Sequence, residues 1–238
     1  MSRDQNHRQI LKKRELINII QDLSSFSSPK LKWEQYSTDA VATADLFYYI
    51  TFEQQELQDR IMIDFGCGPG HLTVAGLLLG ARHVLGIDID SEALQLYEQN
   101  LARLNLRNRV SILQADLTLT TNHSRIIDAL NSIQKHNLGS PQIIGVSNPP
   151  FGVHNKGVDV KFVQQAIQVV DVLYSIHLQS DKIRRFLQRK IPQIGGSISN
   201  IGSLSMFLPH SYQHHQKKRK RILTDVYRII PKSNASTH

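Results

Sequence analysis

With 238 residues, the chain is long enough to bury a sizeable core and most simply forms one globular domain. Its hydrophobic content of 40% argues against global disorder, and its one cysteine, Cys67, excludes an internal disulfide or a zinc site built from cysteines. The formal net charge of +8 favours a polyanionic partner such as nucleic acid, although a basic surface without such a partner would have the same composition.

The first residues, Met1 to Arg14, are polar and basic and lack the apolar core of a signal peptide. No apolar run in the sequence approaches the roughly 20 residues that span a bilayer. A single cysteine also fits a reducing compartment. We therefore expect a soluble, cytoplasmic protein without a membrane partner, or a nuclear one as well if its source is a eukaryote.

The N-terminal part of the chain, about residues 1–55, predicts a helical extension. Apolar side chains have helical spacing at Ile10, Leu11, Leu16, Ile17 and Ile20. The Ser-rich stretch before Pro29 would end this first helix. A compact polar and aromatic segment follows at residues 31–36, and Thr38 or Asp39 could cap a second helix that runs to about Phe52.

From residue 61 onward, the sequence alternates between short apolar runs and amphipathic segments. Buried strands are predicted at residues 61–64, 83–89, 110–116 and 142–148. The helices predicted between them end near Leu79, Asn105 and His136. This alternation predicts a doubly wound α/β fold with a parallel sheet, in which ligands bind at the carboxyl ends of the strands.

The C-terminal third departs from this alternation. A long helix is predicted from about Asp159 to Leu178 or beyond, and the helical pattern stops after Pro192. Further strands are predicted at residues 197–204, 206–208 and 223–230. The last two could pair as an antiparallel hairpin, and residues 232–238 are expected to form a disordered tail.

A glycine-rich turn follows the first predicted strand. It has the sequence Asp64-Phe65-Gly66-Cys67-Gly68-Pro69-Gly70. Glycines permit a tight turn and a close approach of backbone to ligand. Twenty residues after Gly68, Asp88 ends the second strand, where a carboxylate can accept hydrogen bonds from both ribose hydroxyls. The dehydrogenase form of this loop would place glycine at His71; here Gly70 comes one residue earlier, which resembles the form that binds S-adenosylmethionine.

A second pair of candidate cofactor residues follows the third strand. Asp116 could bond the amine of the cofactor's adenine, and the backbone of Leu117 could contact the same ring. Each acid alone is more simply a helix cap or a turn residue. Together, Asp64, Asp88 and Asp116 place acids at three successive strand ends, which favours a methyltransferase.

The fourth strand ends in Asn148-Pro149-Pro150-Phe151, which resembles the NPP[FY] signature of methyltransferases that act on a planar nitrogen. The Asn148 side-chain oxygen and the Pro149 carbonyl could accept the two N–H bonds of a target amine. Pro149 and Pro150 fix their backbone φ angles, so the acceptors are aimed before the substrate arrives. Phe151 could stack on the base; the simpler alternative is a rigid turn after a strand.

Several motifs extend this resemblance to nearly the whole chain, from about Lys30 to Ile230. The first is Trp33-Glu34-Gln35-Tyr36-Ser37-Thr38, which is similar to an L-E-Q-Y-x-T box. The others are DFGCGPG, GIDID, SNPPFG, Asn155-Lys156-Gly157-Val158-Asp159 and Leu208-Pro209-His210-Ser211-Tyr212. On these motifs the chain resembles the methyltransferase-like protein 5 family, which makes N6-methyladenosine in small-subunit ribosomal RNA. Ser37 and Val158 depart from the residues usual in the family, as do Phe65 and Pro69 in the glycine loop.

The resemblance implies a class I, Rossmann-like methyltransferase fold: a mostly parallel seven-stranded sheet with a C-terminal antiparallel hairpin and helices on both faces. Residues 1–231 would be one methyltransferase domain. Gln35 and Thr38 would close over S-adenosylmethionine. The partners implied are ribosomal RNA of the small subunit and a small zinc-binding activator protein that covers an apolar sheet edge.

The remaining candidates lie mostly near the C-terminus. The basic run Lys217-Lys218-Arg219-Lys220-Arg221 could contact RNA phosphates, or could be a solvated hairpin loop. No metal site is expected, since His214 and His215 lack further ligands at a sensible spacing. Cys67 is expected to pack the glycine loop, and Trp33 and Tyr36 to line the cofactor entrance or to pack the N-terminal segment.

Other functions stay open at this point. A protein glutamine N5-methyltransferase acting on release factors has the same fold and an NPPY motif, but Phe151, the early box and the basic run argue against it. A non-catalytic RNA-binding ribosome-assembly factor would not need an intact NPPF and three acids. A DNA adenine methyltransferase would be expected to carry a separate target-recognition domain.

Overall fold

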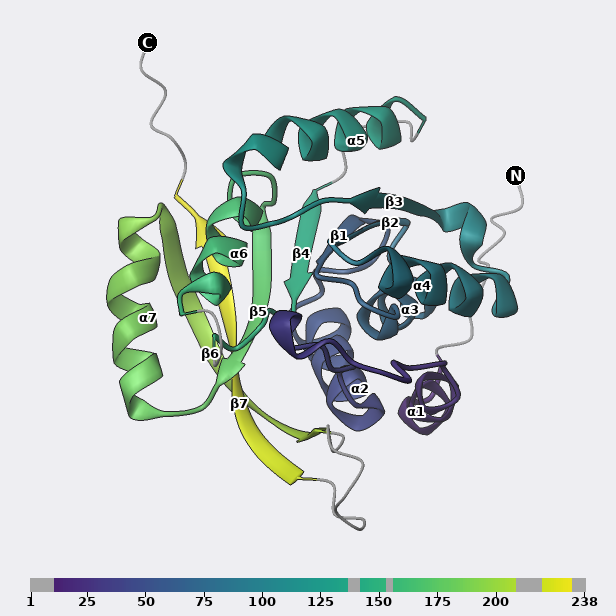
Figure 1. The fold of residues 1–238 in the computed structure, drawn as a ribbon, viewed down its shortest axis with the longest axis horizontal. Helices are drawn as coiled ribbons and strands as arrows, with labels where there is room; N and C mark the ends of the chain where they lie inside the picture. Colours follow the sequence, from purple (N-terminus) through teal and green to yellow (C-terminus); the bar gives the residue numbers. More distant parts are fainter. Residues whose placement is uncertain (1–10, 137–141, 153–155, 209–219, 233–238) are drawn as a thin grey trace, which may run out of the picture.

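A single mixed sheet forms the centre of the computed structural model, which describes residues 11–136, 142–152, 156–208 and 220–232 (Figure 1). Its strands are β1 Ile61–Phe65, β2 His83–Asp88, β3 Val110–Gln114, β4 Ile143–Ser147, β5 Val172–Leu178, β6 Gly196–Leu208 and β7 Lys220–Pro231. They lie in the order β3-β2-β1-β4-β5-β7-β6. Strands β1 to β5 are parallel, and β7 runs antiparallel to both β5 and β6. The expected mostly parallel sheet with a C-terminal hairpin is confirmed.

Helices cover both faces of this sheet. Helices α1 Lys13–Gln21, α2 Ala40–Tyr48, α3 His71–Leu78 and α4 Ser91–Arg103 pack on one face, and α5 His123–His136, α6 Val158–Ala166 and α7 Asp181–Gln193 pack on the other. Strand β1 shows why both faces need cover. Met62 points into the first core cluster, whereas Ile63 and Phe65 point into the second, and the whole strand is buried. Alternate residues of a strand face opposite sides, so a strand buried on both sides is apolar throughout.

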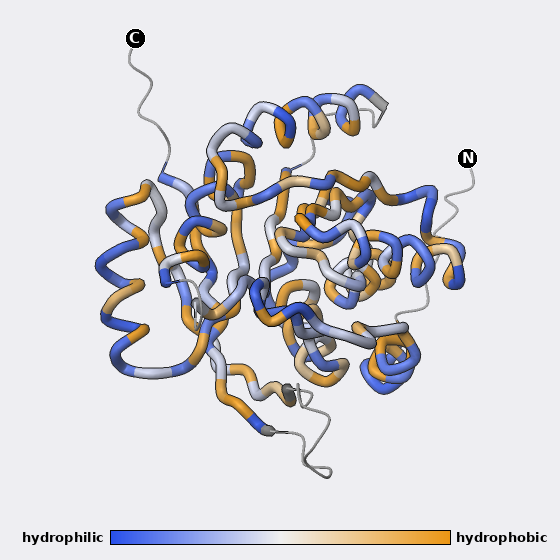
Figure 2. Tube along the Cα trace, in the orientation of Figure 1, coloured by the Kyte–Doolittle hydropathy of each residue, from blue (hydrophilic) through white to orange (hydrophobic). Residues whose placement is uncertain are grey.

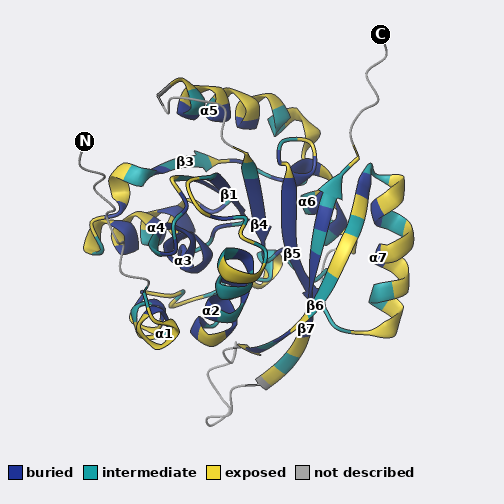
Figure 3. Ribbon diagram, turned by 180° about the vertical axis from the view of Figure 1, so that it is seen from behind, coloured by how far each residue is buried: buried dark blue, intermediate teal, exposed yellow. Residues whose placement is uncertain are grey.

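The distribution of apolar and buried residues follows the same layers. Orange apolar segments lie along the central strands and the inner faces of the helices in Figure 2, and β1, β4 and β5 are almost wholly buried in Figure 3. By contrast, the edge strand β6 alternates between buried and exposed residues. Among the described helices, none is both long enough and apolar enough to cross a membrane.

Local sequence signals account for the helix starts. The Asp39 carboxylate accepts hydrogen bonds from the backbone N–H groups of Val41 and Ala42, at 3.1 Å each, and so caps α2. Asp90 and Ser180 cap α4 and α7 in the same way. Thus, of the two candidates for the second helix, Asp39 is the cap.

The prediction of one helix from about Asp159 to Leu178 or beyond is wrong. Helix α6 ends at Ala166, and residues 172–178 form β5, which lies between β4 and β7 near the middle of the sheet. This run is buried on both sides, even at the polar residues Ser175 and His177, and periodicity alone cannot separate such a strand from a buried helix. The predicted strands 197–204 and 206–208 are parts of the single strand β6.

Parts of the predicted C-terminal features lie outside the described residues. One is the segment that joins β6 to β7, which contains His214, His215 and the first three residues of the basic run, Lys217, Lys218 and Arg219. The other is residues 233–238 of the predicted tail. Lys220 begins β7, and the exposed Arg221 donates from Nε to the Ser205 hydroxyl at 2.7 Å.

Candidate active site

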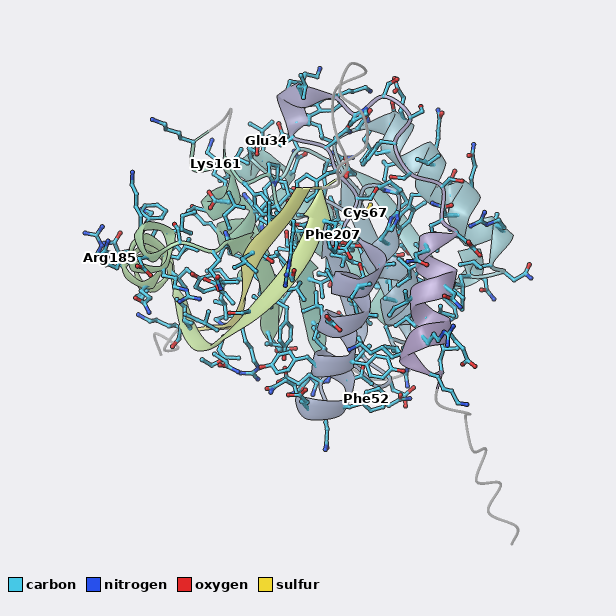
Figure 4. All side chains as sticks on the ribbon, turned by 90° about the horizontal axis from the view of Figure 1, so that it is seen from below. Glu34, Phe52, Cys67, Lys161, Arg185 and Phe207 are labelled. Carbon is cyan, nitrogen blue, oxygen red and sulfur yellow. The ribbon has the colours of Figure 1, made fainter. Side chains whose placement is uncertain are left out.

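A cavity of about 590 Å³ opens at the carboxyl ends of the parallel strands. Its walls come from the glycine loop after β1, from the ends of β2, β3 and β4, from the N-terminal part of α6 and from the segment before α2. Figure 4 looks onto this edge of the sheet, with Glu34 and Lys161, which both line the cavity, in neighbouring positions. The topology therefore brings most of the sequence motifs to one place.

The glycine loop and Asp88 form one wall. Gly66 and Gly68 have φ angles of 80° and 50°, a region in which only glycine is unstrained. The Gly68 N–H donates to Asp88 Oδ2 at 2.8 Å, and the Asp90 N–H donates to Asp88 Oδ1 at 2.9 Å. Each carboxylate oxygen has a further lone pair, so Asp88 can still accept from two adjacent hydroxyls. Burial raises the pKa of Asp88, against the lowering effect of these backbone bonds.

The same wall offers bare backbone and a further carboxylate to the cavity. A methyl group added at Gly66 would come within 3.0 Å of the Phe162 ring, so the backbone there must stay bare. Asp116 and Leu117 line the same cavity two and three residues after the end of β3. Asp116 Oδ1 accepts from the N–H and the hydroxyl of Thr118, at 2.8 and 2.7 Å. Among the described residues nothing bonds Oδ2, which leaves an acceptor for an amine.

Three of the predicted cofactor residues do not line the main cavity: Thr38, which belongs to the segment before α2, and two residues of the glycine loop, Asp64 and Gly70. Asp64 is fully buried below the loop, where its Oδ2 accepts from the Thr73 hydroxyl at 2.7 Å and its Oδ1 has no partner among the described residues. Burial raises the pKa of Asp64 to about 7. Gly70 immediately precedes α3 and has a φ angle of 94°, and a methyl group there would lie 2.7 Å from the Tyr97 ring. Both residues support the loop from beneath.

Residues 22–39 form a strap that runs along the carboxyl edge of the sheet between α1 and α2 (Figure 1). At one end Ser24 exchanges two 2.9 Å hydrogen bonds with the Asn100 side chain. In the middle, Lys30 Nζ and Gln35 Nε2 both bond the Asp90 carboxylate, at 2.8 and 2.7 Å. Phe26 lies over the glycine loop, since a methyl group added at Gly68 would be 3.5 Å from its ring. The strap is thus fixed against the wall of the cavity that contains the glycine loop.

The other end of the strap meets the NPPF motif. The Tyr36 hydroxyl donates to Asn148 Oδ1 at 2.9 Å, and Asn148 Nδ2 donates to the Thr38 hydroxyl at 2.9 Å. Asn148 and Pro150 line the cavity, together with Trp33 and Tyr36. The Phe151 ring lies 5.3 Å from the Tyr36 ring and packs against the core.

These contacts refine the expected roles of the strap residues and the motif. Gln35 lines the cavity, but its amide bonds Asp90 and the Lys30 backbone N–H. The Thr38 hydroxyl bonds Asn148 and does not line the main cavity. Pro149 and Phe151, two of the four expected catalytic residues, also lie outside the main cavity lining.

Several cavity residues were not predicted from the sequence, among them Phe26, Lys161 and Phe162. Phe26 belongs to a Ser-rich stretch that has no periodicity, and no local signal could have found it. Lys161 and Phe162 lie on α6 at positions i+3 and i+4 from Val158, so a helix starting near the expected Asp159 would have shown that they share its face.

Neither a metal site nor a reactive thiol is evident in the part of the chain that the structure describes. No group of three or more His, Cys, Asp or Glu side chains there could hold a metal ion. Cys67 is buried in the glycine loop, and burial raises the pKa of its thiol well above the usual value. A buried, protonated thiol is a packing residue and not a nucleophile.

Comparison with known proteins places this site among methyltransferases. The family model for ribosomal protein L11 methyltransferase (PrmA) matches residues 48–130. The rRNA N(6)-adenosine-methyltransferase METTL5 of Danio rerio is 30% identical over 93% of this chain and 100% of its own length. Mettl5 of Drosophila melanogaster is 29% identical over 92% of this chain and 96% of its own length. A solved structure from Pyrococcus horikoshii, provisionally described as an RNA methyltransferase, is 27% identical with a TM-score of 0.76, over 93% of this chain and 98% of that one.

Proposed function

Because the chain belongs to the METTL5 family of rRNA N6-adenosine methyltransferases, we propose that it transfers a methyl group from S-adenosylmethionine to N6 of an adenosine in ribosomal RNA. The observation that carries the proposal is the Asn148 carboxamide, which forms part of a cavity wall shared with Asp88, Asp116 and the glycine loop. One cavity then holds a hydrogen-bond acceptor for the amine beside acceptors suited to a nucleoside cofactor.

The cofactor would be held by residues of the first wall. Asp88 would accept from the ribose hydroxyls, and Asp116 with Leu117 would contact the adenine. Gly66 and Gly68 would let the backbone approach the methionine part. Bound there, S-adenosylmethionine would supply an electrophilic methyl group on its sulfonium.

The protein would contribute positioning and hydrogen bonding at the target amine. The lone pair of an exocyclic adenine amine is delocalised into the ring, which makes the amine a poor nucleophile. Asn148 Oδ1 would accept one of its two N–H bonds and so draw the lone pair out of conjugation. The Pro149 carbonyl stays the candidate acceptor for the other bond and Phe151 the candidate to stack on the extruded base, and both would have to turn toward the cavity, because neither residue lines it in this structure. No strong base is required, because the amine becomes acidic only as it is methylated and then gives its proton to water.

Basic side chains at the cavity support an RNA substrate. Lys32, Lys156 and Lys161 all line it, and the last two are exposed beside the N-terminus of α6. We expect the double change Lys156→Ala and Lys161→Ala to weaken RNA binding and to reduce the slope of log K against log salt by about 0.7 for each phosphate that the protein no longer neutralises. Arg185→Ala is the matched control, because Arg185 lies on α7, away from the cavity (Figure 4). An unchanged slope would show that these lysines do not contact phosphates.

The small ribosomal subunit is the proposed source of the RNA, on the strength of the sequence motifs. A small zinc-binding activator protein is the proposed partner. Strand β3 supports this partner, because it is an edge of the sheet and leaves Ile112 and Leu113 only half-buried. An open edge strand with apolar side chains is a ready site for pairing with another chain. Charged substitutions at both residues should prevent co-purification of the activator; unchanged co-purification would remove this edge from consideration.

The test of the proposed function is to incubate the protein with labelled S-adenosylmethionine and one of three substrates: small-subunit rRNA, large-subunit rRNA or release-factor protein. Each reaction is run with and without the activator. Digestion of the RNA to nucleosides should return the label as N6-methyladenosine from the small-subunit RNA. Label in a protein glutamine would instead identify a glutamine methyltransferase, and label in large-subunit RNA alone would refute the proposed subunit.

A further inference from the structure

The carboxamide of Asn148 is held between two hydroxyl groups of the strap. Tyr36 donates to its oxygen and Thr38 accepts from its nitrogen, each at 2.9 Å. The two contacts join residues more than a hundred positions apart in the sequence. Thr38 is buried, and burial also raises the pKa of Tyr36 well above its usual value, so its hydroxyl stays protonated and able to donate.

Among the described residues, Tyr36 is the one that bonds the amide oxygen, which leaves one acceptor position on it. A carboxamide oxygen has two lone pairs, and the Tyr36 hydroxyl uses one of them. The bond from the amide nitrogen to Thr38 polarises the group and strengthens the oxygen as an acceptor. A side chain bonded from both ends also loses little further rotational freedom when a substrate arrives.

Both hydroxyls are themselves held in place. Thr38 precedes Asp39, whose carboxylate caps α2 with one oxygen and accepts from the Phe207 N–H of β6 with the other, at 2.8 Å. The Tyr36 ring contacts the Phe151 ring at 5.3 Å with an angle of 39° between the planes. Tyr36 therefore touches both the amine acceptor and the aromatic ring of the NPPF motif.

We propose that Tyr36 and Thr38 are positioning residues for methyl transfer, which fix the Asn148 carboxamide so that its free lone pair meets the target amine. The inference rests on the proposed function and deepens it. It also links the two halves of the site: Gln35 bonds Asp90 beside the cofactor wall, and the next residue, Tyr36, orients the amine acceptor. The strap is then a part of the reaction centre as well as a cover for the cofactor.

Two substitutions remove the hydroxyls with little change of shape. Tyr36→Phe keeps the ring against Phe151, and Thr38→Val keeps the branched side chain. Each should lower kcat about tenfold or more, the effect expected from losing one orienting bond and misplacing the acceptor. The affinities for S-adenosylmethionine, by calorimetry, and for RNA, by filter binding, should stay within about twofold of wild type.

Two further variants separate positioning from strap stability. Thr38→Ser retains a hydroxyl and should keep most of the wild-type kcat. Ser37→Ala is the matched control, because it removes the 2.7 Å hydroxyl bond between Ser37 and Ser25 in the same strap without touching Asn148. If Thr38→Val fails to fold, Tyr36→Phe carries the test alone.

The outcomes are distinct. Wild-type kcat in Tyr36→Phe and Thr38→Val, or a loss in Ser37→Ala equal to theirs, would overturn the inference. A fall in cofactor affinity that accounts for the whole rate loss would overturn it too, since the hydroxyls would then serve cofactor binding. If the wild-type protein methylates no RNA at all, the proposed function fails and the inference falls with it.

Discussion

Replacement of Asp64 by asparagine tests the electrostatics beneath the cofactor loop. The acid is fully buried, one of its oxygens has no partner among the described residues, and its pKa of about 7 compares with 3.8 for an unburied aspartate. Burial is the main cause, and the nearby Asp88 carboxylate adds to it. A raised pKa means that the folded state binds the proton more tightly than the unfolded state, so stability is lost as pH rises from about 4 to about 7.

The magnitude follows from the shift. At about 1.4 kcal/mol for each pH unit, a shift of roughly 3 units makes the ionised Asp64 cost about 4 kcal/mol above pH 7. A neutral carboxamide at this position would carry no such cost, so we expect Asp64→Asn to gain stability relative to wild type by about 2–3 kcal/mol between pH 5 and pH 8. This is a large part of the total stability of a typical domain.

The assay is urea unfolding followed by circular dichroism at several pH values from 5 to 8. The quantity of interest is the difference in unfolding free energy between variant and wild type, because titrations common to both proteins cancel. Asp128→Asn, which removes an exposed carboxylate from α5, controls for the loss of one negative charge. A difference that stays constant over this pH range would refute the burial argument for Asp64.

Two further changes test the loop and its surroundings. Gly86→Ala should lower the free energy of unfolding by about 1–3 kcal/mol, because a methyl group there would overlap the hydroxyl of the fully buried Tyr97. Gly202→Ala is the control, since open space surrounds Gly202 and the melting temperature of this variant should stay nearly unchanged. Equal melting temperatures for the two variants would contradict the packing described for β2. Asp88→Asn should weaken S-adenosylmethionine binding by about 2 kcal/mol, or roughly 30-fold. The amide would place an N–H group where the carboxylate accepts from backbone N–H donors, and it would remove the negative charge from the proposed ribose bonds. A wild-type affinity measured by calorimetry would exclude Asp88 from the cofactor site.

The parts of the site that could be predicted from sequence are those fixed by local geometry. The glycine loop, Asp88, Asp116 and Asn148 each lie at or just after the end of a strand, and a parallel sheet brings the carboxyl ends of its strands to one edge. Predicting the strands was therefore enough to bring these residues together. Their roles in binding and transfer stay predictions until the variants above are measured.

The remaining features depend on contacts that no local pattern encodes. The sequence predicts helix where β5 lies, because a short run buried on both sides has neither helical nor alternating periodicity. The strap follows no regular pattern, so its hydrogen bonds to Asp90 and Asn148 appear only in three dimensions. The bond between Thr38 and Asn148 is also a contact of this kind. From the sequence, Thr38 is therefore expected only as a possible helix cap and, on the family resemblance, as a cofactor residue.

The central claim is that Asn148 accepts a hydrogen bond from the target amine. The most direct test is to measure methyl transfer to small-subunit rRNA by the Asn148→Ala variant. The rate of N6-methyladenosine formation should fall below detection while calorimetry shows S-adenosylmethionine bound within a few-fold of wild-type affinity. Methylation at the wild-type rate by Asn148→Ala would contradict the account, because the amine would then have found its acceptor elsewhere.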